Sequence, residues 1–213
     1  MKNKFLVSLV VMASYFIIAV ASSGGNDKDS KEKNEKKIAS FLDTLPQSQK
    51  DFLAIEMKYD TIFDNCKNDL QFSSKSDDKD KELKDLFKKE EFRSMEVKNW
   101  RGVVEKVLSI NGDAGIKIHV MYEPEHTITS PGFYLTSEAI LEEDNQMGKG
   151  SIGKSSPLFK QIVDLQEGSE IEFSGKFYKS WFANRFLYTN TEYVNLEQEY
   201  LFKVTELKVL KAK

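Results

Sequence analysis

The chain has 213 residues, with 31 Lys and Arg against 34 Asp and Glu, so its formal net charge is −3. A nucleic-acid-binding domain usually carries a positive excess, and this composition does not supply one. Hydrophobic residues make up 40% of the sequence, which is enough for one domain with a real core. Because Cys66 is the single cysteine, an internal disulfide is excluded and stability must come from that core.

Residues 1–21 have the layout of a secretory signal peptide. Lys2 and Lys4 precede an apolar run over residues 5–20, and residues 19–21 (Ala-Val-Ala) form an A-x-A cleavage signal. An uncleaved signal anchor is the alternative, since the apolar run is near the lower limit for spanning a bilayer. Both alternatives predict an exported protein that is periplasmic, secreted or anchored to the membrane by this segment.

A charged linker and a helical lead-in are expected next. The linker covers residues 22–37, and its part from Asn26 onward has no apolar residue, which predicts disorder or frayed helix. The lead-in covers residues 38–94. Its first long helix runs to residue 70 with Pro46 in a first turn, and its second follows a break at 68–76, with Asp77 or Asp78 as N-cap. The first helix is predicted from one apolar stripe at three- and four-residue spacing, formed by Phe52, Ile55, Tyr59, Ile62, Phe63 and Cys66.

From about residue 95 the apolar period changes from near 3.6 to 2, which predicts β-strands to the end of the chain. Asn111-Gly112-Asp113 is a turn signal between the first strand and a half-buried second strand at 116–122. Gly175 predicts a bulge or a sharp bend, and a change of parity near Thr205 predicts a second bulge. The remaining elements are expected as a strand within 132–141, a short helix at 156–165, and strands at 171–177, 185–194 and 200–209.

This order of elements favours an α+β fold, mainly β, in which residues 95–213 form an OB-fold-like Greek-key barrel. The predicted helix lies between the third and fourth strands, and the helical segment precedes the barrel. Strands and helices do not alternate along the chain, so a parallel sheet is not expected.

Four short motifs give the chain a family resemblance. It resembles a family of exported, mostly uncharacterised bacterial proteins whose OB-fold is similar to tRNA-anticodon-binding and nucleic-acid-binding OB domains. The resemblance covers about residues 40–210 and implies the fold, but it carries no catalytic motif, and fold does not imply function. The motifs are LPQSQKDF at 45–52 with Asn68-Asp69-Leu70, Trp100-Arg101-Gly102, Ser156-Pro157-Leu158-Phe159 with LQEG at 165–168, and FSGKF at 173–177.

Residues 148–155 (GKGSIGKS) satisfy the phosphate-loop pattern G-x-x-x-x-G-K-S. That pattern binds phosphate only when a buried strand leads into the loop and a helix leaves it. Here an acidic stretch at 142–146 precedes the loop, and its carboxylates would repel a triphosphate. We therefore expect an ordinary loop and no nucleoside triphosphate ligand.

Other catalytic and metal patterns are weak. A zinc site would need the two histidines, His119 and His126, together with carboxylates or Cys66. His126 is interpreted as a solvated loop residue, with a carboxylate–histidine surface metal site in residues 123–127 as the alternative. The chain has no nucleophile-elbow motif. We expect no enzymatic activity, no metal and no cofactor.

The candidate binding surface is the outer side of the barrel, because OB-folds bind ligands across the second and third strands and the flanking loops. Aromatic rings beside cations are typical of sites for single-stranded nucleic acid or sugar. For Trp181 and its neighbour Phe182 the alternative is that they cap one end of the barrel. The candidate residues are Lys117, His119 and Met121 on the second strand, Arg101 and Tyr178 on neighbouring strands, and Lys179, Trp181 and Arg185 in the loop after the fourth strand.

The first hypothesis is a non-enzymatic binding module of the cell envelope that acts on an envelope protein, a glycan or an oligonucleotide. The alternative is a single-stranded nucleic-acid-binding OB-fold protein, which the negative charge and the export signal disfavour. An envelope-modifying enzyme is a third hypothesis without a supporting motif.

Overall fold

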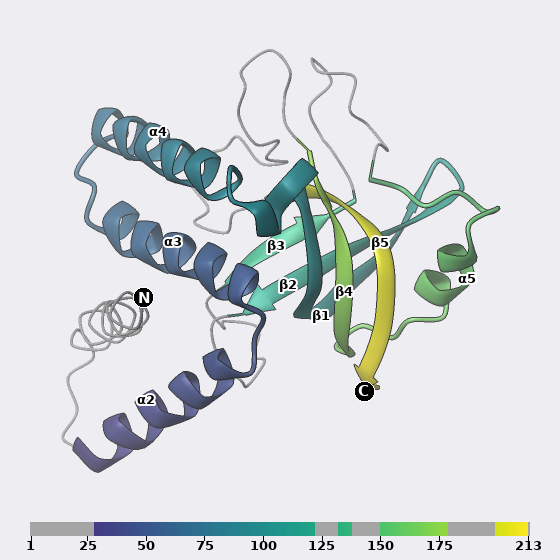
Figure 1. Cartoon of the computed structure of the whole chain (residues 1–213), viewed down its shortest axis with the longest axis horizontal. Helices are drawn as coiled ribbons and strands as arrows, with labels where there is room; N and C mark the ends of the chain where they lie inside the picture. The colour runs from purple at the N-terminus through teal and green to yellow at the C-terminus, as the bar shows by residue number, and fades with distance from the viewer. Residues whose placement is uncertain (1–27, 122–131, 138–149, 179–198, 213) are drawn as a thin grey trace.

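A computed structural model describes residues 28–121, 132–137, 150–178 and 199–212 (Figure 1). The predicted signal segment, the predicted fifth strand at 185–194, and Lys179, Trp181 and Arg185 lie outside these residues. The described elements, in chain order, are α2 (Lys28–Asp43), α3 (Gln47–Asp64), α4 (Asp69–Leu86), the 3₁₀ helix η1 (Glu90–Met95), β1 (Glu96–Ile110), β2 (Asp113–Met121), β3 (Gly132–Thr136), α5 (Pro157–Val163), β4 (Glu170–Phe177) and β5 (Glu199–Lys211).

The five strands pair in the order β1-β2-β3-β5-β4, and β4 also pairs with β1, so the sheet closes into a ring. Four of the five pairings are antiparallel, whereas β3 and β5 run parallel. The expectation of a mixed fold with a short helix between the third and fourth strands is confirmed.

Two local predictions for the strands are also confirmed. Asn111 and Gly112 have φ angles of 52° and 86°, as the two-residue turn of the β1–β2 hairpin requires. Between β4 and β5, Ser174 pairs with Glu206 and Gly175 with Val204, so Thr205 is the extra residue of a bulge.

The helical boundaries differ from those predicted. Helix α2 begins at Lys28, inside the segment expected to be disordered or frayed. Pro46 occupies the N-cap position of α3 and not its first turn. Helix α4 begins at Asp69, because the Asn68 side chain accepts a hydrogen bond from the backbone N–H of Gln71 at 3.0 Å. The predicted break at 68–76 and the N-cap at Asp77 or Asp78 are therefore wrong.

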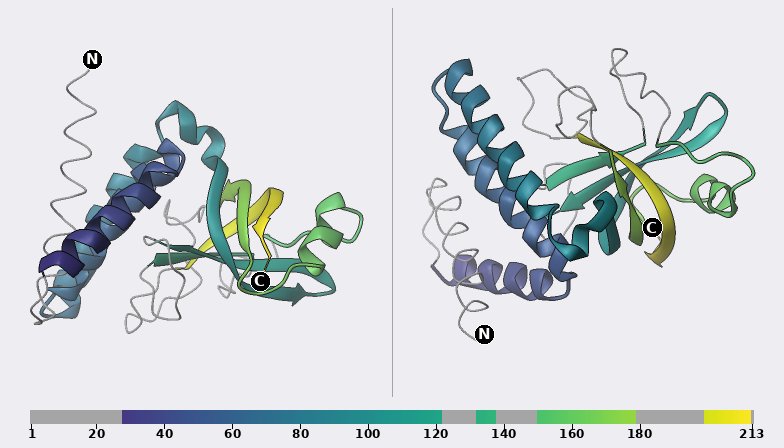
Figure 2. Two further views of the ribbon diagram at one scale, coloured as in Figure 1. Left: turned by 90° about the horizontal axis from the view of Figure 1, so that it is seen from below. Right: turned by 45° about the horizontal axis from the view of Figure 1, so that its top comes forward.

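Helix α3 docks against one end of the ring through Phe52, which is fully buried. Its ring centroid lies 5.0–5.5 Å from four aromatic rings contributed by four strands, namely Trp100, Phe133, Phe177 and Tyr200. Figures 1 and 2 show α3 and α4 side by side on this side of the strands, with α5 on the opposite side. The expectation that the helical lead-in docks on the strands is confirmed.

A buried glutamine joins α3 to β1. The Gln49 side chain accepts from the Arg101 N–H and donates to the Arg101 carbonyl, both at 2.8 Å. The pairing of β1 with β2 ends at Val103, so the Gln49 amide bonds the β1 backbone beyond its last pair with β2. Among the described residues, no helix is long and apolar enough to span a membrane.

Candidate ligand-binding face

The outer face of β2, β3 and the start of β5 brings together four side chains that can contact a ligand. His119 pairs directly with Tyr134, and Tyr134 pairs with Glu199. Lys117 precedes His119 by two residues, so it lies on the same face. Lys117, His119, Tyr134 and Glu199 form what we call the Tyr134 cluster.

The contacts within the Tyr134 cluster centre on the tyrosine ring. The Lys117 ammonium lies 4.2 Å from the centroid of the Tyr134 ring, a cation–π contact, and it also forms an ion pair with Glu199. On the same ring, the His119 imidazole stacks with a centroid distance of 4.6 Å and an interplanar angle of 19°. The cluster therefore combines a cation, a carboxylate and two stacked rings.

Burial divides the cluster into a floor and a rim. His119 and Tyr134 are 2% and 7% exposed, whereas the side chains of Lys117 and Glu199 keep 25% and 19%. A ligand would thus meet the charged rim, because the aromatic floor is buried beneath it. The prediction of a half-buried second strand is wrong here, because His119 and Met121, expected to point into solvent, are both buried. Alternation along β2 distinguishes the two faces of the strand, but it does not show that the second face is buried as well.

The two remaining described candidates, Tyr178 and Arg101, lie at different distances from the cluster. The Tyr178 N–H donates to the Leu201 carbonyl at 3.2 Å, two residues after Glu199, and burial raises the pKa of Tyr178. Arg101 lies elsewhere, since its guanidinium donates to Thr44 Oγ1 at 3.5 Å beside the α2–α3 junction. The structure therefore brings Tyr178 near the Tyr134 cluster and separates Arg101 from it.

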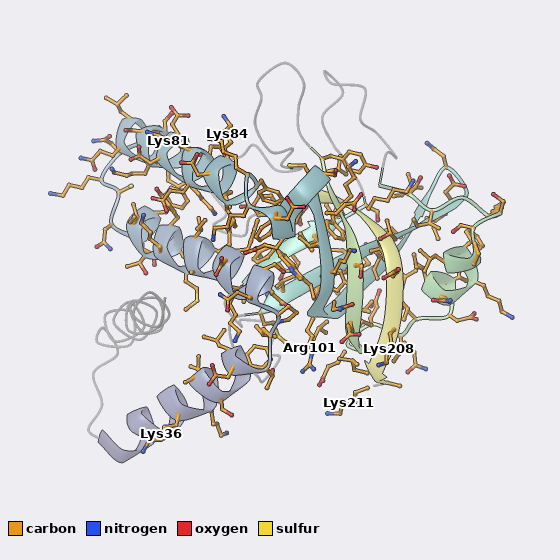
Figure 3. All side chains as sticks on the ribbon, in the orientation of Figure 1. Lys36, Lys81, Lys84, Arg101, Lys208 and Lys211 are labelled. Atoms are coloured by element: carbon orange, nitrogen blue, oxygen red, sulfur yellow. The ribbon has the colours of Figure 1, made fainter. Side chains whose placement is uncertain are left out.

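Arg101 belongs to a surface of alternating charge on β1, β4 and β5. It pairs across the strands with Glu172, and Glu172 pairs with Lys208. Lys211 forms a 3.7 Å ion pair with Glu170 on the same strands. Figure 3 shows Arg101, Lys208 and Lys211 at one end of the ring. Because carboxylates separate these cations, the surface lacks the continuous positive stripe that a nucleic-acid backbone favours.

Tyr134 and Glu199 were not predicted as candidate site residues from the sequence. Tyr134 lies in a segment predicted as a strand, and Glu199 immediately precedes another, so the available signal was alternation along each strand. Their meeting depends on the parallel pairing of β3 with β5, two strands that are more than 60 residues apart in the sequence. Sequence spacing alone does not give that register.

A second polar group lies inside the molecule, between α3, α4 and β5. The Lys79 ammonium contacts Glu56 Oε2 at 2.7 Å, and the Tyr200 hydroxyl donates to Glu56 Oε1 at 2.7 Å. The side chains of Lys79 and Glu56 are each 1% exposed. We call Glu56, Lys79 and Tyr200 the buried triad.

The described part of the G-x-x-x-x-G-K-S motif has the structure of a strand-paired loop. Ile152 forms a bridge with Ala114 through two backbone hydrogen bonds of 2.7 and 3.0 Å. Ser156 caps α5, and its own N–H donates to the Gly153 carbonyl. The backbone N–H groups of Ile152 and Ser156 are thus bonded to carbonyl oxygens.

Among the residues that the structure describes, no group of three His, Cys, Asp or Glu side chains is placed to hold a metal ion.

No family model, curated protein or solved structure matches this chain. The family resemblance of the four motifs therefore stays a prediction.

Proposed function

We propose that this protein is a non-enzymatic binding module of the cell envelope, built on an OB-type barrel, whose ligand contacts the Tyr134 cluster. The fold part of the proposal is supported by the five-stranded ring and by the helix between β3 and β4. OB-folds bind ligands on the outer face of their second and third strands, which is the face that carries His119 and Tyr134. The signal-like residues 1–21 and the four family motifs support export and membership of the exported OB-fold family.

The observation that carries the proposal is the Lys117–Tyr134 contact beside Glu199. The Lys117 ammonium and the Glu199 carboxylate stay partly exposed, and the buried Tyr134 ring below them holds the ammonium in place by the cation–π contact. The paired charges on the rim offer hydrogen bonds of both polarities to a polar ligand. A glycan of the cell envelope fits this chemistry best.

Single-stranded nucleic acid is the second candidate, because OB-folds also bind oligonucleotides across their second and third strands. Against it, Lys117 is already neutralised by Glu199, and the chain is negative overall. Nucleic-acid binding would weaken steeply with salt, whereas glycan binding would not.

Binding of the purified protein to soluble cell-wall glycan fragments and to single-stranded oligonucleotides, each titrated at several salt concentrations, tests the proposal. Saturable, salt-insensitive glycan binding is the expected result. Salt-sensitive oligonucleotide binding would select the second candidate. The absence of saturable binding to both probes, or turnover of a substrate that one point substitution abolishes, would contradict the proposal.

A further inference from the structure

The buried triad connects the helical hairpin α3–α4 to the start of β5. Glu56 lies on α3, Lys79 on α4 and Tyr200 on β5, and both carboxylate oxygens of Glu56 are engaged. Apolar rings surround the ammonium, which lies 5.8 Å from the centroid of Phe63 and 6.0 Å from that of Tyr200. A buried ion pair of this kind adds little net stability, but it penalises any arrangement that separates its members. It therefore fixes where the hairpin sits relative to β5.

The same piece of β5 carries the Tyr134 cluster on its other side. Successive residues of a strand point to opposite faces, so Tyr200 points toward the helices while Glu199 points outward to Lys117. On β3, Tyr134 pairs with Glu199 on the outer side, and the preceding residue Phe133 points inward. Phe133 packs 5.0 Å from Phe52 of α3 and 5.7 Å from Tyr200. The segments of β3 and β5 that carry Tyr134 and Glu199 are thus held from inside by the hairpin.

We infer that the α3–α4 hairpin positions the Tyr134 cluster through Tyr200, so that loosening the hairpin lowers ligand affinity at the cluster. Tyr200 and Phe133 are positioning residues, because they act through their neighbours Glu199 and Tyr134. The affinity part of this inference rests on the proposed function, whereas the mechanical coupling does not.

The experiment is Tyr200→Phe in the full chain, compared with Tyr59→Phe. The second variant is a matched control, since the Tyr59 hydroxyl donates to Glu82 within the hairpin at 2.9 Å and does not reach the strands. Hydrogen exchange by mass spectrometry follows peptides over residues 132–137 and 199–202. Because the Tyr200 hydroxyl donates to a charged carboxylate, we expect exchange there to rise about tenfold in Tyr200→Phe. Residues 107–116, at the far β1–β2 turn, should keep their wild-type exchange.

Unchanged exchange at 132–137 and 199–202, an equal rise in Tyr59→Phe, or an equal rise at 107–116 would each overturn the inference. If Tyr200→Phe does not fold, the double variant Glu56→Leu/Lys79→Met removes the acceptor of Tyr200 without leaving a buried charge, and the same peptides decide. Titration of the wild-type chain and of the variant with the soluble glycan fragments then tests whether ligand affinity falls as well. A rise in exchange without any glycan binding to the wild-type chain leaves the coupling standing and removes the proposed function.

Discussion

At the scale of single residues, the molecule depends most on the few polar side chains that it buries. Lys79 is 1% exposed and is neutralised by Glu56, which is itself fully buried. Removing one member leaves the other as an uncompensated charge inside the protein, which costs far more than the pair contributes. These two positions were not distinguished by the sequence, where Lys79 lies in the charged run Asp77-Asp78-Lys79-Asp80-Lys81, interpreted as a solvated face.

Lys79→Met is therefore expected to lower the free energy of unfolding by about 3–5 kcal/mol, because Glu56 loses its cation. The double variant Lys79→Met/Glu56→Leu should recover most of that loss, since neither charge is then buried. Urea unfolding followed by circular dichroism measures both. Lys75→Met serves as the control, because Lys75 and its partner Asp78 are exposed, and it should leave the unfolding midpoint unchanged. A double variant as unstable as the single one would show that the pair contributes net stability.

Gly175 is the residue at which a single methyl group should matter most in the strands. A Cβ there would lie 2.3 Å from the Phe202 ring and 2.4 Å from the Lys203 carbonyl oxygen. Because Phe202 is buried and the carbonyl belongs to the paired strand, we expect Gly175→Ala to cost about 1–3 kcal/mol in chemical unfolding. Gly153→Ala is the matched control, since the nearest atom to its Cβ is at 3.8 Å. Equal stability of the two variants would contradict the close approach of β4 and β5.

At the scale of elements, side chains form hydrogen bonds with backbone groups at the end of a helix or of a strand pairing, where backbone partners are missing. Asn68 supplies an acceptor to the start of α4, and Gln49 supplies both a donor and an acceptor to β1 beyond its last pair with β2. Gln49 is 1% exposed, which is rare for a glutamine unless it is fully bonded.

Gln49→Ala should lower the free energy of unfolding by about 2 kcal/mol, because the N–H and carbonyl of Arg101 both lose their partner. Gln47→Ala, two residues earlier, is the control; its exposed amide bonds Asp51 within the same helix, so its loss should be small. Thermal unfolding of the two variants, measured side by side, compares their losses of stability. A Gln49→Ala variant as stable as Gln47→Ala would mean that water replaces the amide at β1.

The success of sequence prediction differed among the elements for physical reasons. The β1–β2 turn and the bulge at Thr205 were predictable because Asn-Gly chemistry and a parity change act over a few residues. The start of α4 was missed because residues 69–78 are mostly polar. A stacked contact between Phe72 of α4 and Phe63 of α3, with ring centroids 4.5 Å apart, helps to hold this first turn in place. This contact joins two helices.

At the scale of the whole molecule, the helical lead-in and the ring of strands share one hydrophobic core. Leu53, Leu83 and Leu86 of the helices belong to the same cluster of buried residues as Ile118 and Phe173 of the ring. The candidate face was half predictable from sequence: Lys117 and His119 follow from alternation along one strand, whereas Tyr134 and Glu199 depend on pairing between strands far apart in the chain.

The most direct test of the central claim is the affinity of Lys117→Met for the soluble glycan fragments. Because Lys117 supplies the cation on the rim and the Tyr134 contact, we expect binding at least tenfold weaker than that of the wild-type protein. Lys160→Met, which removes an exposed cation from α5, should bind like the wild type. Equal loss in both variants, or unchanged binding in Lys117→Met, would contradict a ligand site at the Tyr134 cluster.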